Sequence, residues 1–296
     1  MLNPISLTFL SFSLGGCGPK ATPETAAPEQ AAPAPAEAAP AAPTSTTVKA
    51  SEVAWKPINP EQPDGPMWVI LDGDPKTEAF AAMAKVPAGF SPGLHTHGNT
   101  MTGLVISGTM VNGRTAEEAV VLSPGSMWSQ PGGEARYTGC TEASECVFVL
   151  TMDGPVVRSI AEAPAEKSTQ IVMAANEIDY VPMNADQPDG PALKMVHGDP
   201  STGPWMAFAK LPAGQEASEA MNTANYTGAL ISGSFPYGEG DITPGSHWTQ
   251  AGGPPHMTTC NEGGDCIFFV SMSEALTPPA SEDATEEAPA EESAAE

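Results

Sequence analysis

The sequence has few basic residues and no long apolar run. Only 11 Lys and Arg stand against 36 Asp and Glu in 296 residues, which gives a formal net charge of −25. Proteins that bind nucleic acid neutralise phosphates with clustered Lys and Arg, so this composition argues against nucleic acid as a partner. No stretch reaches the roughly 18 apolar residues that a transmembrane helix needs. The sequence therefore predicts no membrane-spanning helix.

Common catalytic motifs are also absent. The chain contains no nucleophile elbow, no phosphate-binding P-loop, no glycine fingerprint for dinucleotides and no HExxH zinc motif. No motif in the sequence therefore predicts nucleophilic hydrolysis, phosphate or dinucleotide binding, or zinc-dependent proteolysis.

Two stretches of the chain match each other closely. Residues 123–150 and 243–270 share seven uncommon features in the same order: Pro124/Pro244, Trp128/Trp248, Gln130/Gln250, Gly132/Gly252, Cys140/Cys260, Cys146/Cys266 and Phe148/Phe268. Such a match predicts an internal duplication. Short β-rich runs alternate with Pro-Gly and Gly-Gly turns in both repeats, which indicates an all-β fold. We expect the two domains to cover residues 48–156 and 171–276.

The segments outside the repeats have a different composition. Residues 17–47 are rich in Ala and Pro, and we expect a disordered tether there. Residues 157–170 are predicted to link the two domains. Residues 277–296 are acidic and poor in apolar side chains, so we expect a disordered C-terminal tail.

The N-terminal segment resembles a bacterial lipoprotein signal. Residues 1–16 hold a short apolar run that ends in small residues directly before Cys17. The resemblance implies cleavage before Cys17, a lipid on its sulfur and a membrane anchor in the cell envelope, on the periplasmic or outer-surface face. The segment departs from the pattern because no Lys or Arg precedes the apolar run. An ordinary cysteine after an apolar N-terminus is the alternative.

The other four cysteines form two pairs with the same spacing. Five residues separate Cys140 from Cys146, and five separate Cys260 from Cys266. This spacing fits a hairpin whose two strands place the Cβ atoms opposite each other, and an exported protein would keep the cysteines oxidised. We therefore expect two disulfides within the pairs; two pairs of free thiols are the alternative.

Two motifs in the first repeat resemble those of the cupin superfamily. Cupins carry G-x5-H-x-H-x3-E-x6-G and then G-x5-P-x-G-x2-H. The first spacing is reproduced from Gly89 to Gly108, and the second from Gly125 to Arg136. The ending of each repeat also resembles bacterial cupin-like proteins of unknown function. The resemblance implies two tandem cupin-like jelly-roll barrels, that is, a bicupin.

Neither repeat keeps the metal ligands that the resemblance implies. Typical metal-binding cupins hold zinc, manganese or iron with three His and one Glu. The first repeat has His95 and His97, but Met101 and Arg136 occupy the other two positions. The second repeat has only one of the four residues, as the set Ala220, Asn222, Tyr226 and His256 shows.

These departures leave three hypotheses for the function. The preferred one is non-catalytic binding of a small molecule, with Arg136 holding an anion beside His95 and His97. Arg136 could instead form an ion pair at the rim with Glu134 or another local acid. The second hypothesis is a metal-dependent enzyme that uses His95 and His97 with a further ligand, and the third is a structural or partner-binding protein. The further candidate pocket residues are Met101, Asn222, Tyr226 and His256. The sequence leaves open which face of strands 127–130 and 247–250 points inward.

Overall fold

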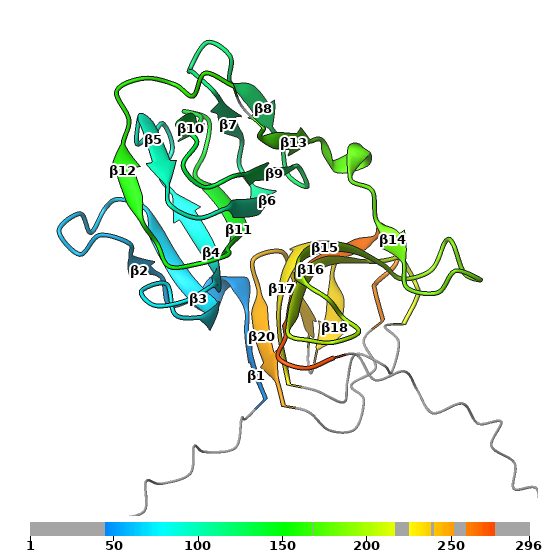
Figure 1. Ribbon diagram of the computed structural model, residues 1–296. Helices are drawn as coiled ribbons and strands as arrows, with labels where there is room; N and C mark the ends of the chain where they lie inside the picture. Colours follow the sequence, from blue (N-terminus) through cyan, green and yellow to red (C-terminus); the bar gives the residue numbers. More distant parts are fainter. Residues whose placement is uncertain (1–44, 168, 217–224, 238–239, 252–258, 276–296) are drawn as a thin grey trace, which may run out of the picture. The chain divides into compact units, whose positions relative to one another are not determined.

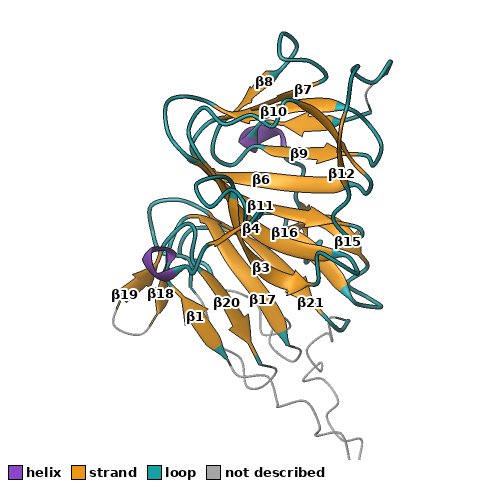
Figure 2. Cartoon of the chain, turned by 90° about the vertical axis from the view of Figure 1, so that its left-hand side faces the viewer, coloured by secondary structure: helices purple, strands orange, loops and turns teal. Residues whose placement is uncertain are grey.

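The computed structural model describes residues 45–167, 169–216, 225–237, 240–251 and 259–275. These residues fall in one compact unit (Figure 1). The predicted signal segment, nearly all of the tether and the acidic tail lie outside the described residues. Within them, the elements are antiparallel strands and two three-residue 3-10 helices, η1 (Ala50–Glu52) and η2 (Ala175–Glu177) (Figure 2). The predicted all-β class is confirmed.

Residues 56–173 supply two sheets. The seven-stranded sheet, called the first large sheet here, has the order β13 (Ile171–Met173), β9 (Met127–Gln130), β6 (Met101–Ser107), β11 (Cys146–Met152), β4 (Phe80–Val86), β3 (Met67–Gly73) and β2 (Lys56–Pro57). The five-stranded sheet has the order β12 (Arg158–Ile160), β5 (Leu94–His97), β10 (Arg136–Cys140), β7 (Met110–Gly113) and β8 (Val120–Leu122). Strand β12 lies within the segment 157–170 that the sequence assigns to a linker.

A corresponding set of strands, all but one of them later in the chain, forms two more sheets. The second large sheet has the order β1 (Thr46–Val48), β20 (His247–Gln250), β17 (Tyr226–Ser232), β21 (Cys266–Met272), β16 (Trp205–Leu211), β15 (Ala192–Gly198) and β14 (Val181–Pro182). A two-stranded sheet pairs β18 (Phe235–Tyr237) with β19 (Gly240–Ile242).

The edge strands β1 and β13 are exchanged between the two large sheets. Strand β1 precedes the strands of the first large sheet in the chain, but it pairs with β20 of the second, where Thr47 lies opposite Trp248. Strand β13 precedes the strands of the second large sheet but pairs with β9 of the first, where Val172 lies opposite Trp128. Each large sheet is therefore completed by a strand that precedes the other sheet in sequence.

The central strands of the large sheets are buried on both faces. All seven residues of β11 are buried. Phe148 and Leu150 face an apolar cluster that includes residues of the five-stranded sheet such as Met110. Val149 faces the opposite way, into a cluster that contains Phe208 and Phe269 of the second large sheet. A strand buried on both faces reads as a continuous apolar run, which explains the sequence of this segment.

In each large sheet, a glycine allows a tryptophan ring to lie over the neighbouring strand. Gly103 lies opposite Trp128, and a Cβ atom on it would lie 2.3 Å from the indole ring. Gly228 lies opposite Trp248, with a corresponding separation of 2.2 Å. Only glycine permits this close approach, so each Gly-Trp pair fixes the ring across the neighbouring strand.

Both predicted disulfides are present and are therefore confirmed. Cys140 is bonded to Cys146 and Cys260 to Cys266, each with 5.8 Å between Cα atoms. The predicted hairpin was wrong, because Cys140 ends β10 in the five-stranded sheet and Cys146 begins β11 in the first large sheet. That disulfide joins two different sheets. Each bridge closes a short loop, so its stabilisation is about 2 kcal/mol by the chain-entropy relation.

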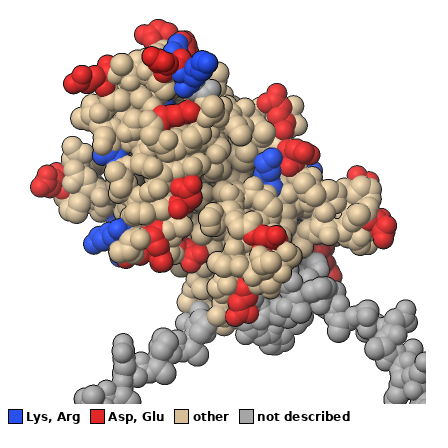
Figure 3. Space-filling view, viewed as in Figure 1, with Lys and Arg blue, Asp and Glu red and all other residues tan. Residues whose placement is uncertain are grey.

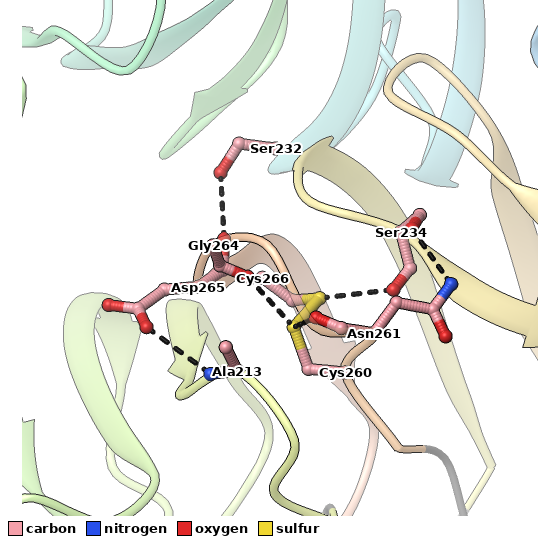
Figure 4. The surroundings of a disulfide bond; sticks show 8 residues. All are labelled: Ala213, Ser232, Ser234, Cys260, Asn261, Gly264, Asp265 and Cys266. Atoms are coloured by element: carbon pink, nitrogen blue, oxygen red, sulfur yellow. Dashed lines mark hydrogen bonds between the residues drawn. A yellow bond between two sulfur atoms is a disulfide. The ribbon is translucent and has the colours of Figure 1, made fainter.

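The second disulfide is surrounded by polar contacts that hold its loop in place. The Asn261 side-chain amide donates a hydrogen bond to Ser234 Oγ at 2.8 Å, and the Ala213 backbone N–H donates one to Asp265 Oδ1 at 3.3 Å (Figure 4). Both cysteines are fully buried against the apolar cluster of the second large sheet.

In the described parts of the chain, no helix is long and apolar enough to span a bilayer.

Candidate functional site

The candidate site in the first repeat lies between the first large sheet and the five-stranded sheet. His95 and His97 are two positions apart on β5 and so point to the same side of the strand. Arg136, on β10, lies opposite His95 in the antiparallel ladder. Met101 begins β6 in the facing sheet, and its ladder partner on β9 is Gln130. The structure thus brings together all four first-repeat positions that the cupin resemblance marks, and Gln130 with them.

Arg136 is buried without an anionic partner. Its side chain is 2% exposed, and Nη2 approaches the Met101 thioether at 3.7 Å, which is a weak acceptor. Nε and Nη1 have no hydrogen-bond partner. Among the described residues no ion pair includes Arg136. The alternative of a rim ion pair with Glu134 is therefore wrong: the carboxylate of Glu134 accepts hydrogen bonds from Thr169 instead, at 2.6 Å from Oγ1.

Burial lowers the pKa of each titratable side chain in the cluster. It lowers the pKa of Arg136 to about 9, so the guanidinium stays protonated at neutral pH. It also lowers the pKa of His95 to about 4 and that of His97 to about 3, and the positive charges of Arg136 and Arg158 contribute to both decreases. At pH 7 the cluster therefore holds one buried positive charge, on Arg136, beside two neutral imidazoles, and the exposed Arg158 of β12 lies opposite His97.

Hydrogen bonding fixes the tautomer of one imidazole. His95 Nδ1 lies 2.8 Å from the carbonyl oxygen of Gly93. A carbonyl only accepts, so Nδ1 carries the hydrogen and Nε2 offers a lone pair. His97 Nδ1 is buried and has no partner. The two rings meet edge to face, with centroids 5.1 Å apart.

The described residues do not fit the divalent metal that the cupin resemblance implies. No group of three or more His, Cys, Asp or Glu that could hold a metal lies in the described parts of the chain. His95 and His97 would be joined only by a thioether, which prefers soft ions over manganese or iron(II). Arg136, in the strand register directly opposite His95, carries a positive charge that would repel a cation. This donor set suits an anion better than a zinc, manganese or iron ion.

More buried polar atoms without partners surround the cluster. In the described residues ten such side-chain atoms are found, and seven belong to strands β5, β7, β9 and β10: His97 Nδ1, Asn112 Nδ2, Trp128 Nε1, Gln130 Oε1, Arg136 Nε, Arg136 Nη1 and Thr138 Oγ1. Buried polar groups nearly always have partners, so this concentration indicates a place where a polar ligand or water binds.

Sequence reasoning did not single out Asn112, Thr138, Trp128 or Gln130 as site residues. Asn112 lies opposite Thr138 in the β7–β10 ladder, and Thr138 is two positions from Arg136 on the same face of β10. One signal was available for Gln130, because the Trp-x-Gln sequence recurs as Trp248-x-Gln250. Asn112 and Thr138 carried no such signal.

The structure determines which faces of β9 and β20 point inward. Trp128 and Gln130 are buried on the side of the five-stranded sheet, whereas Met127 faces the other large sheet. Trp248 likewise packs with Phe235 and Phe268 in the second half of the chain. Of the second-repeat candidates, Tyr226 lies beside this tryptophan, and burial raises its pKa. Asn222 and His256 lie outside the described residues.

The surface offers no continuous basic patch on the face shown in Figure 3. Lys and Arg side chains lie apart from one another there, among more widely spread Asp and Glu. The ion pairs of the described residues join single, partly exposed side chains, such as Lys210 with Asp265 at 2.9 Å and Arg114 with Glu118 at 2.7 Å. Arg136 differs from these cations because it is buried and unpaired.

Comparison with known families assigns the chain to one of them. A family described as "Domain of unknown function (DUF4437)" matches residues 46–278. The chain belongs to this family. The DUF4437 match extends over nearly all of the described residues and begins at the first residue of β1. No curated protein matches the sequence.

Solved structures show the fold of this DUF4437 chain. A candidate dioxygenase from Nostoc punctiforme is similar with a TM-score of 0.56 and 14% identity, covering 78% of this chain and 83% of that one. The pirin YhhW from Escherichia coli, solved with nickel(II), has a TM-score of 0.47 and 10% identity over 78% of this chain and 100% of that one. Quercetin 2,3-dioxygenase from Acinetobacter baumannii has a TM-score of 0.43 and 11% identity, over 78% and 86%. Together with the antiparallel sheets, the first of these likenesses supports a cupin-like fold, and at this identity it carries no activity across.

Proposed function

We propose that this DUF4437 protein binds a small anionic molecule, with a carboxylate on Arg136, between the first large sheet and the five-stranded sheet. One observation carries the proposal: a 2% exposed guanidinium has unpartnered Nε and Nη1 groups, and no acid of the described residues lies within ion-pair distance of it. A buried charge without a counter-charge costs several kcal/mol. A bound carboxylate would remove that cost and would accept charge-assisted hydrogen bonds.

The neutral imidazoles favour binding over chemistry on the ligand. A general base acts best when its pKa lies near the working pH, and His95 and His97 have pKa values of about 4 and 3. They are too weakly basic to remove a proton efficiently at neutral pH. Their role in this proposal is to line the site and to offer nitrogen atoms for hydrogen bonds.

Titration of simple anions tests the proposal. Acetate and formate, titrated into protein dialysed into an anion-poor buffer, are expected to bind the wild-type chain with one site in calorimetry. Arg136→Met should abolish this binding. Arg114→Met is the matched control, because Arg114 lies at an exposed loop paired with Glu118, and it should bind like the wild type. Equal binding to wild type and Arg136→Met would refute the proposal.

The finer architecture is part of the same proposal. Two tandem jelly-roll barrels, at residues 48–156 and 171–276, would have arisen by duplication. The support is the correspondence of strand orders in the two large sheets, in which β9, β6, β11, β4 and β3 match β20, β17, β21, β16 and β15. The matching Gly-Trp pairs and disulfides add to it.

Placement in the cell envelope rests on the N-terminal segment alone. Small residues directly before Cys17 support a lipid anchor on the periplasmic or outer-surface face of a bacterial membrane. Cys17→Ser is expected to move the protein from the membrane to the soluble fraction, as measured by fractionation and immunoblotting. An unmutated protein that is soluble and still carries residues 1–16 would contradict the anchor.

A further inference from the structure

We infer that the anion bound at Arg136 is a small hydroxy monocarboxylate, a molecule with a single carboxylate and at least one hydroxyl group. This inference rests on the proposed function and adds the class of ligand. It is drawn from the hydrogen-bonding character of the buried atoms that lack partners around Arg136.

The charge of the site limits the ligand to one negative charge. Among the buried polar side chains of the described residues, Arg136 is the only one that carries a formal charge at pH 7, since His95 is neutral there. Arg158, opposite His97 on β12, also acts on both imidazoles, but it is exposed, so water and salt screen its charge. A monocarboxylate would balance it. A dicarboxylate would leave one negative charge uncompensated in the interior, at a cost like that of the unpaired guanidinium.

Gln130 requires a hydrogen-bond donor on the ligand. Its Nε2 donates to the carbonyl oxygen of Glu134 at 2.7 Å, which fixes the orientation of the amide. Oε1 then faces the interior without a partner, in a side chain that is 1% exposed. Gln130 is the ladder partner of Met101, whose sulfur contacts Arg136. A carboxylate has only acceptors, so a hydroxyl group near the carboxylate would supply the missing donor.

Asn112 and Thr138 form a second polar position. Asn112 is fully buried; its Oδ1 accepts a hydrogen bond from Gln170 Nε2 at 2.6 Å, and its Nδ2 has no partner. Thr138 Oγ1 also lacks a partner. Thr138 and Arg136 are two residues apart on β10, so their Cα atoms are about 6.6 Å apart. A hydroxyl oxygen can accept from Asn112 while exchanging a hydrogen bond with Thr138, whereas a methyl group would leave both unsatisfied.

Four three-carbon acids test this inference by calorimetry: propionate without a hydroxyl group, lactate with one, glycerate with two and malonate with a second carboxylate. Glycerate is expected to bind most tightly, then lactate, then propionate. Each hydroxyl group should lower the dissociation constant about threefold to tenfold, the usual range for a net hydrogen bond. Malonate should bind more weakly than glycerate.

Two nearly isosteric variants locate the hydroxyl contacts. Gln130→Met removes the side-chain amide and Thr138→Val removes the hydroxyl group. Each replacement has nearly the same volume as the original side chain. Each is expected to reduce the advantage of glycerate over propionate about threefold to tenfold. Thr115→Val, in the loop between β7 and β8, serves as the control and should not change this advantage.

The outcomes separate this inference from the proposed function. If propionate binds in an Arg136-dependent manner and glycerate binds no better, the hydroxyl inference is wrong and the anion site stands. If malonate binds more tightly than glycerate, the single-charge argument is wrong. If none of these acids and neither acetate nor formate binds, the buried polar atoms are satisfied by water alone and both proposals fall.

Discussion

Replacing Arg136 by Met is expected to stabilise the ligand-free protein by about 1 to 4 kcal/mol, the upper range for replacing a buried ion pair by apolar residues, because an unpaired buried charge has no Coulombic gain to lose. The guanidinium is 2% exposed and lacks an anionic partner. The methionine side chain would lie beside the Met101 thioether and other apolar groups. Equilibrium unfolding in urea, with bound anions removed, measures the difference.

The same variant is expected to lose anion binding, so stability and function should change in opposite directions. Arg136→Lys provides the comparison, because it keeps the charge and should stay close to the wild type in stability while losing the forked geometry of the guanidinium. A marked destabilisation of Arg136→Met, in protein free of anions, would mean that the arginine has a structural partner and would contradict the account.

Acidification is expected to destabilise the protein through His95 and His97. The pKa of each is lowered in the folded state from an ordinary value of 6.5, to about 4 and about 3. Between pH 6.5 and these values the unfolded chain binds more protons than the folded chain. Stability is therefore fully present above pH 6.5 and decreases as the pH falls toward 4 and 3. By pH 5 the loss is about 2 kcal/mol for each histidine.

Comparing the pH dependence of stability between the wild type and a variant separates the contribution of the two histidines from that of the many carboxylates. The double variant His95→Gln/His97→Gln should lose about 4 kcal/mol less stability between pH 7.5 and pH 5 than the wild type does. His197→Gln is the control, because His197 is exposed at the end of β15, and its pH dependence should equal that of the wild type. Identical pH profiles for the double variant and the wild type would show that the two imidazoles protonate normally in the folded chain.

The local features of the fold were predictable from the sequence, whereas the exchange of edge strands was not. Regular β-rich runs and Pro-Gly turns predicted an all-β chain, and equal cysteine spacing predicted both disulfides. Nothing in the short sequences Thr46–Val48 and Ile171–Met173 specifies which sheet they join, because an edge strand pairs through backbone groups common to all residues. The hairpin assumed for Cys140 and Cys146 failed for a related reason: spacing indicates proximity, but it does not distinguish a hairpin from a turn between two sheets.

The candidate site was predictable only in part. The cupin motif spacing led to His95, His97, Met101 and Arg136, which the structure brings together. Spacing could not show that Arg136 lacks a counter-charge, because a partner can come from anywhere in the chain. Asn112 and Thr138 were missed because single polar residues on strands more often face solvent, and their burial depends on the packing of two sheets.

A crystal structure of the protein grown with saturating glycerate would show directly whether Arg136 binds the anion. The carboxylate of glycerate is expected at hydrogen-bond distance, about 2.7–3.2 Å, from Nε or Nη1 of Arg136, with a hydroxyl group next to Gln130 Oε1. Ordered water alone beside the guanidinium, or glycerate bound elsewhere on the protein, would contradict this expectation.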